Sequence, residues 1–147
     1  MEKSEKGAEI RVVHLRGDAF EIRVRDHYIQ IDQPHEDGTE DLGPTPTELF
    51  AASIAACAGY YARRFLARHG VDDHVLVRAD WSSGTKPSRI TDITLQILAP
   101  DLPADLNDRF LTTVRRCSLK NTLENPPEIR VELEAPSPSA AVRRRAS

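Results

Sequence analysis

The sequence predicts a single α+β domain of the order βββ-α-ββ-α-β, and three observations carry this prediction. The first is an alternation of apolar and polar residues with a period of two, typical of strands, which occurs near both ends of the chain and in its middle. The second is a long stretch of helical periodicity between residues 45 and 70. The third is the length, because 147 residues suffice for one hydrophobic core and correspond to one domain.

Three short strands are predicted in the N-terminal part of the chain. Apolar and polar residues alternate over residues 10–15 and 20–25, and Ile29 and Ile31 continue the pattern. Residues 16–18 (RGD) provide the first turn. The period of two predicts a sheet with one face turned to water.

A long polar loop follows at residues 33–44 (QPHEDGTEDLGP), and loops of this length are often functional. Its acidic residues invite a calcium-binding interpretation. The EF-hand spacing is absent, however, because Asp37 and Gly38 are followed neither by ligands at the required offsets nor by a closing glutamate. A solvated loop is therefore the better prediction.

The central element is a long helix that begins near residue 45 and stops at Gly70. Thr45 as N-cap, Pro46 at the first helical position and Glu48 two residues later form a capping box. One face is an apolar stripe, and a second face consists of small residues. The stripe contains Phe50, Ile54, Cys57, Tyr61 and Phe65, and the small-residue face contains Ala52, Ala56 and Gly59; Ala51 and Ala55 are further small residues of the helix.

The remaining elements are a hairpin, a second helix and a last strand. Alternating residues at 75–81 and 93–99 flank the turn SSGTKPS. The second helix begins near Pro103 and carries an apolar stripe that ends at Cys117. The breaker Asn125-Pro126-Pro127 precedes a last strand with Ile129, Val131 and Leu133. The folded domain is thus expected at residues 9–134, between a flexible N-terminus (1–8) and a disordered basic tail (135–147).

Composition limits the possible partners. The net charge is −3, and without the tail residues Arg143, Arg144 and Arg145 the chain has 17 basic and 23 acidic residues, which argues against nucleic acid. No apolar run is long enough to cross a membrane, and the N-terminus MEKSEKGAEI lacks a signal-peptide core. A cytoplasmic protein without membrane contact is expected.

The two cysteines, Cys57 and Cys117, allow two interpretations. In a reducing compartment a permanent disulfide is not expected, so they are either core residues or reactive thiols. Free cysteine packs like a small apolar residue, and both lie on predicted apolar stripes. Zinc is disfavoured because two isolated cysteines and five scattered histidines show no paired ligand spacing, and no other metal or cofactor is indicated.

A family resemblance favours the reactive interpretation. The segment GPTPTELFAASIAACAGYYARRFLARHG, together with IQIDQPHEDGTEDLG before it and RRCSLKNTLENPPEIRVEL after it, resembles the OsmC/Ohr family of thiol-dependent hydroperoxide reductases. The similarity covers about residues 10–134. Its most specific parts are the G-P-T-P-x-E-L helix start, a cysteine nine residues after that glutamate, and a second cysteine before x-x-x-N-T-L.

The resemblance implies an intertwined homodimer with two long central helices and active sites at the subunit interface. It also implies that Cys57 attacks an organic hydroperoxide in defence against peroxide stress and that Cys117 resolves the resulting sulfenic acid as a disulfide. An external dithiol would then reduce the disulfide. The small residues of the long helix would let the two helices pack closely.

The activating cation departs from the family pattern. A thiol needs a nearby cation here, because burial raises its pKa and Cys57 lies too far into the helix to benefit from the helix dipole. The family uses an arginine oriented by the glutamate that matches Glu48. This chain has no arginine between Arg25 and Arg63, which leaves Arg16 in the first strand turn as the candidate, with a solvated surface charge as the alternative.

Glu48 has an independent role as a helix cap. Nine residues of helix rotate by about 900°, which puts Glu48 and Cys57 on opposite faces, so a direct contact is not expected. Three hypotheses therefore stand. The chain is a thiol peroxidase, a protein of the same fold with lost or altered activity that acts as a small-molecule binder or thiol sensor, or a structural dimer module.

Overall fold

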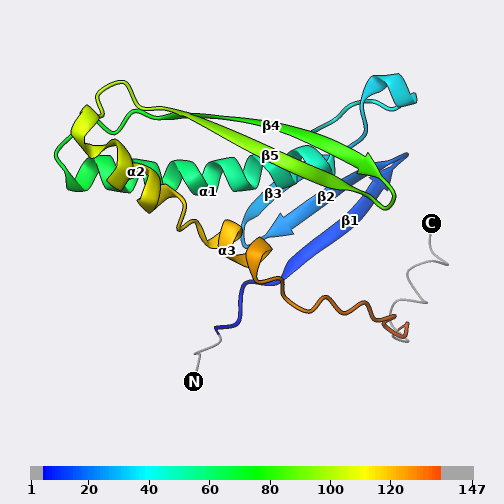
Figure 1. Cartoon of the computed structure of the whole chain (residues 1–147). Helices are drawn as coiled ribbons and strands as arrows, with labels where there is room; N and C mark the ends of the chain where they lie inside the picture. Colours follow the sequence, from blue (N-terminus) through cyan, green and yellow to red (C-terminus); the bar gives the residue numbers. More distant parts are fainter. Residues whose placement is uncertain (1–4, 137–147) are drawn as a thin grey trace.

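The computed structural model describes residues 5–136 of the chain, and Figure 1 shows a long helix beside a two-stranded hairpin, with a separate sheet near the N-terminus. The predicted α+β class is confirmed. Residues 1–4 and most of the predicted tail, including Arg143, Arg144 and Arg145, lie outside the described residues. The regular elements are β1 (Ile10–Arg16), β2 (Ala19–Val24), β3 (His27–Ile31), α1 (Pro46–Arg68), β4 (Leu76–Thr85), β5 (Ser88–Leu98), α2 (Asn107–Val114) and α3 (Ser118–Glu124), with 3₁₀ turns at His35–Asp37 and Ala104–Leu106.

The core lies where α1 packs against the β4–β5 hairpin and α2. Phe65 of α1 and Phe110 of α2 meet edge to face with ring centroids 5.5 Å apart, an arrangement that aromatic rings favour. Leu66 is the largest fully buried side chain of the described residues. The cluster is completed by Ala58, Ala62 and Val114. The second half of α1 thus forms the centre of this cluster, while Ala51 and Ile54 are the buried residues of its first half.

The strands β1, β2 and β3 form an antiparallel sheet in that order, with Val12, Ile22 and Ile29 aligned across it. This apolar face is poorly covered, since Ile10 is 63% and Val12 56% exposed. Within residues 5–136 the sheet makes few contacts with α1 or the hairpin. A single chain therefore leaves an apolar sheet face in water, which is energetically unfavourable.

The start of α1 has the capping box that the sequence predicts. The backbone N–H of Glu48 donates to Thr45 Oγ1 over 3.1 Å, and the backbone N–H of Thr45 donates to Glu48 Oε2 over 2.7 Å. At the other end Gly70 adopts a left-handed conformation with φ of 66°, which ends the helix at little steric cost. Both ends of α1 are therefore determined by nearby sequence.

Thr45→Ala is expected to lower the free energy of unfolding by about 1 kcal/mol, because the mutation leaves an N–H group of the first turn without its acceptor. Urea denaturation followed by circular dichroism measures the loss. Thr47→Ala is the matched control, since Thr47 lies exposed in the same turn and is not the cap. Equal losses in the two variants would contradict this role of Thr45.

Two local predictions were wrong. The second helix is broken: α2 ends at Val114, and Cys117 has extended backbone angles (φ −50°, ψ 129°) and serves as the N-cap residue of a separate helix, α3. The last strand does not form within the described chain, where Ile129, Val131 and Leu133 are 82%, 94% and 100% exposed. A strand needs a hydrogen-bonded neighbour, and residues 5–136 provide none for this segment.

No helix among residues 5–136 combines the length and the apolar character needed to cross a membrane.

Candidate functional site

The two cysteines meet between the middle of α1 and the start of α3. Cys57 lies half-buried on α1, and Cys117 is buried at the N-cap position of α3. Both are free thiols, and they lie close enough for Cys57 to contribute to the raised pKa of Cys117. The fold thus brings together two cysteines that are 60 positions apart in the sequence. Cys117 was predicted inside the second helix, but it precedes α3 instead.

The surroundings of Cys117 favour its protonated form. Burial raises the pKa of the Cys117 thiol, and the neighbouring Cys57 raises this pKa further. The backbone N–H groups of Lys120 and Leu119 act in the opposite direction and only partly offset the rise. No guanidinium among the described residues contributes to this shift. Cys117 is therefore a protonated, poorly accessible thiol at neutral pH.

A hollow of about 430 Å³ opens beside Cys117, between α1, β5 and the two short helices. Its walls are mostly apolar, and Arg115 and Lys120 are its charged members. Lys120 forms an ion pair with Glu124 one turn further along α3. The apolar lining consists of Ile54, Ala58, Ile93, Leu95, Ile97, Leu111, Val114 and Leu123.

A second hollow of about 630 Å³ continues this surface toward the start of α1. Ile93 and Leu123 line both hollows, and Phe50, which is 41% exposed, lines the second. The two hollows are therefore adjacent, and the second one is also lined by the charged residues Arg89 and Asp92.

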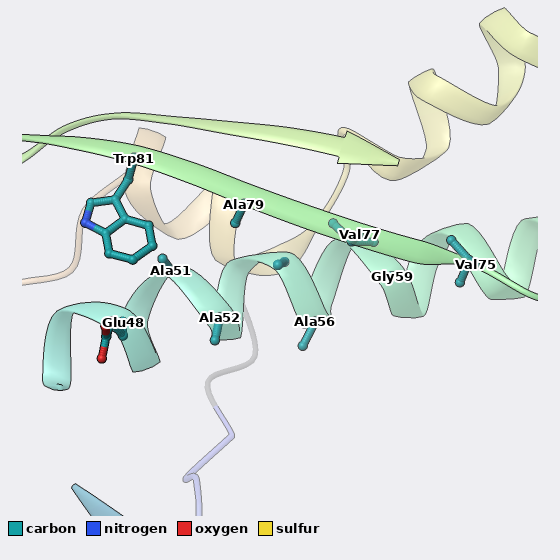
Figure 2. Close-up of a pocket in the computed structure, with 10 residues that line it drawn as sticks. Glu48, Ala51, Ala52, Ala56, Gly59, Val75, Val77, Ala79 and Trp81 are labelled. Atoms are coloured by element: carbon teal, nitrogen blue, oxygen red, sulfur yellow. The ribbon is translucent and has the colours of Figure 1, made fainter. Parts of the chain in front are cut away.

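Glu48 lies on a different face of α1 from Cys57, as the helical rotation predicts. It lines a groove of about 480 Å³ between α1 and β4 that also contains the small residues of the helix and Trp81. In Figure 2, Glu48, Ala52 and Ala56 point away from β4, while Ala51 faces Trp81. Because α1 is unbroken over Pro46–Arg68, Glu48 cannot turn toward Cys57 of its own chain.

Arg16 is held at the surface by Glu40 of the polar loop. Its Nη2 lies 2.6 Å from Glu40 Oε2 and its Nε 3.0 Å from Oε1, and this pairing raises the pKa of Arg16. Figure 1 shows the end of β1, where Arg16 lies, turned away from α3. Within one chain Arg16 therefore does not join the two thiols.

Sequence reasoning missed the groups that join α1 to α3 beside the thiols. Tyr61 follows Cys57 by one helical turn, and its hydroxyl lies 3.2 Å from Ser118 Oγ in a hydrogen bond. Arg115 is a second missed residue, since it lines the hollow of Cys117. The sequence offered only one indication of these residues, namely their proximity to Cys117. Ser118 follows Cys117 directly, and Arg115 precedes it by two positions.

One group of possible metal ligands occurs among residues 5–136. Asp72, Asp73 and His74 each bring a ligand atom within 4.8 Å of the others. These side chains already have partners, because Asp72 hydrogen-bonds His74 and Asp73 pairs with Arg63 over 2.8 Å. Acidic groups at a surface often cluster in this way without binding a metal.

The fold has clear counterparts among solved structures. An organic hydroperoxide resistance protein OsmC from Legionella pneumophila is 19% identical, with a TM-score of 0.63 over 82% of this chain and 91% of that one. An OsmC-like protein from Mycoplasma pneumoniae, also 19% identical, reaches 0.68 over 84% and 91%. The organic hydroperoxide resistance protein OhrB of Bacillus subtilis, again 19% identical, reaches 0.58 over 88% and 98%.

The comparison with protein families identifies the chain more directly. No curated protein matches it. A family model described as "OsmC-like protein" matches residues 38–132, a span that includes the capping box of α1, the hairpin and both cysteines. The chain therefore belongs to the OsmC-like protein family.

Proposed function

We propose that this protein is a cysteine-based peroxidase that reduces organic hydroperoxides. The Cys57 thiolate attacks the peroxide oxygen, the O–O bond breaks, and an alcohol leaves with a proton from the surroundings. The sulfenic acid on Cys57 then condenses with the Cys117 thiol to give a disulfide and water. An external dithiol returns both cysteines to the thiol state by exchange.

The observation that carries the proposal is the contact between the two thiols. Cys57 is the more accessible of the pair, as an attacking group must be, whereas burial and the raised pKa of Cys117 suit a thiol that acts second. Two cysteines 60 positions apart in the sequence thus lie close enough to interact, as an attacking and a resolving thiol must. The family assignment supports a redox role in general terms.

The lining of the hollows supports an organic rather than a small hydrophilic peroxide. Aliphatic side chains dominate the hollow beside Cys117, whereas the neighbouring hollow combines Phe50, Ile90 and Ile93 with the charged Arg89 and Asp92. Burying an alkyl or aryl group there removes apolar area from water at about 25 cal/mol per Å². Hydrogen peroxide gains nothing from such a surface.

A second copy of the chain would complete the site. The exposed face of β1–β3, the unpaired segment around Val131 and the groove of small residues on α1 are all apolar surfaces without cover in one chain. Proteins of this family are typically dimeric. We include in the proposal a homodimer in which Arg16 and Glu48 act across the interface, since neither reaches Cys57 within its own chain.

A second candidate function is a small-molecule binder or thiol sensor of the same fold. One observation favours it: Arg16, the candidate activating cation, is paired with Glu40 instead of lying beside the thiols. Such a protein would keep the apolar hollow and the thiol pair without rapid turnover.

The test is to treat the purified, reduced protein with stoichiometric cumene hydroperoxide, tert-butyl hydroperoxide or hydrogen peroxide. The peroxidase hypothesis predicts that both organic peroxides rapidly remove two free thiols per chain and that mass spectrometry finds a Cys57–Cys117 link. Hydrogen peroxide should react more slowly. Oxidation of one cysteine without a disulfide would favour the sensor. Thiols that react only after denaturation would refute both the peroxidase and the thiol sensor and leave the small-molecule binder.

A further inference from the structure

Tyr61 and Ser118 form a link between α1 and α3 right beside the two thiols. The hydroxyl groups lie 3.2 Å apart, and among residues 5–136 this is the only side-chain hydrogen bond that joins the two helices. Tyr61 is half-buried one turn after Cys57, and Ser118 is the first residue of α3, directly after Cys117. The hydrogen bond therefore connects α1 with the start of α3, the same two segments that a Cys57–Cys117 disulfide would connect.

Helix α3 has few other attachments. It has seven residues and none of them is fully buried, although Leu119 is half-buried, so apolar packing holds the helix only weakly. Cys117 at its start is the buried point of attachment. An element anchored in this way can shift or fray, and any such motion moves the Cys117 sulfur relative to Cys57.

We infer that Tyr61 is a positioning residue whose hydrogen bond with Ser118 holds Cys117 within bonding reach of Cys57. The inference deepens the proposed function, because it concerns the step in which the disulfide closes. Disulfides tolerate only a narrow range of distances and angles. A bond that restricts α3 raises the effective concentration of one thiol at the other, as a short linker does for two binding sites.

The neighbouring residue provides a matched control. Tyr60 carries the same hydroxyl on the same helix, but that hydroxyl accepts a hydrogen bond from Arg64 over 3.0 Å and does not reach α3. Tyr60→Phe therefore removes an equivalent group from α1 without touching the link. The ring contact between Tyr60 and Tyr61, with centroids 5.6 Å apart, persists in both phenylalanine variants.

The experiment measures how readily the disulfide forms, with glutathione as the redox partner. Wild type, Tyr61→Phe, Ser118→Ala, the double variant and Tyr60→Phe are equilibrated with mixtures of reduced and oxidised glutathione. Oxidised glutathione takes up the two electrons and two protons of the thiol pair, which gives two reduced molecules and the protein disulfide. Acid quenching, alkylation and mass spectrometry then give the equilibrium constant for the Cys57–Cys117 link.

Tyr61→Phe and Ser118→Ala are each expected to lower this constant about threefold to tenfold, as loss of one hydrogen bond predicts. The double variant should match the single variants, because both remove the same interaction. Tyr60→Phe should equal wild type. Unchanged constants in the Tyr61 and Ser118 variants, or losses that multiply in the double variant, would overturn the inference.

Denaturant unfolding of the reduced proteins separates positioning from a general structural role. A lower stability of Tyr61→Phe without any change in the redox equilibrium would overturn the inference. The glutathione measurement contains no peroxide. It therefore tests the effect of Tyr61 on the disulfide equilibrium even if the protein does not reduce hydroperoxides and the proposed function fails. A wild-type protein that forms no intramolecular disulfide under these conditions would overturn both.

Discussion

Cys57→Ser is expected to lower the rate of hydroperoxide reduction by about three orders of magnitude or more, because a serine hydroxyl cannot take the peroxide oxygen as a thiolate does. The change is nearly isosteric at a half-buried position, so the helix should remain intact. Peroxide consumption in the presence of a dithiol measures the loss, and circular dichroism checks the fold. Retention of a substantial part of the activity would contradict the assignment of Cys57 as the attacking residue.

Cys117→Ser is the matched variant, and its expected behaviour is different. It should consume one equivalent of organic hydroperoxide and then stop at a sulfenic acid on Cys57 that dimedone can trap. The first step should survive because the burial and the raised pKa of Cys117 mark it as the second thiol to act. If instead Cys117→Ser abolished the reaction and Cys57→Ser left it intact, the two roles would be reversed.

The parts of the fold that the sequence predicted are those with local causes. Thr45 and Glu48 bond each other across three positions, and Gly70 ends the same helix through its own backbone angles. The hairpin β4–β5 likewise pairs neighbouring segments around a tight turn. Interactions of this kind depend on a few neighbouring residues, so they can be predicted without the rest of the chain.

The parts that failed depend on distant or additional partners. The apolar stripe that ended at Cys117 resembled one helix, but the chain turns there so that Cys117 can be buried and start α3. The alternation around Val131 has the period of a strand, yet pairing requires a neighbour, and the described part of the chain contains none. Periodicity predicts what a segment can form, whereas the neighbours decide what it does form.

The same distinction applies to the site. The opposite orientation of Glu48 and Cys57 followed from helix geometry alone and agrees with the structure. The meeting of Cys57 with Cys117 entered only through the family resemblance, because sequence spacing contains no information about contacts between distant elements. The ion pair of Arg16 with Glu40 joins residues 24 positions apart and could likewise not be predicted from the sequence.

Ala56→Arg is expected to abolish self-association of the chain. Ala56 is exposed on the small-residue face of α1, next to Ala52 and the groove along β4, so a monomer would tolerate the substitution with little change in stability. In the proposed dimer the same position is buried between two closely packed helices. An unpaired guanidinium there costs several kcal/mol, which corresponds to a weakening of more than about a hundredfold.

Analytical ultracentrifugation of wild type and variant over a range of concentrations measures this effect. Ala67→Arg is the control, because Ala67 is also exposed on α1 but lies in its last turn, where Arg64 and Arg68 already contribute charge. The wild type and the control should sediment as dimers and Ala56→Arg as a monomer whose apolar β1–β3 face is exposed to water. If the site is shared between two copies, the rate of peroxide reduction should decrease in proportion to the dimer fraction. Dimer formation through the exposed surfaces would then be required for the thiol chemistry. A wild-type monomer with full activity would instead require every catalytic group to come from one chain, in which neither Arg16 nor Glu48 reaches Cys57.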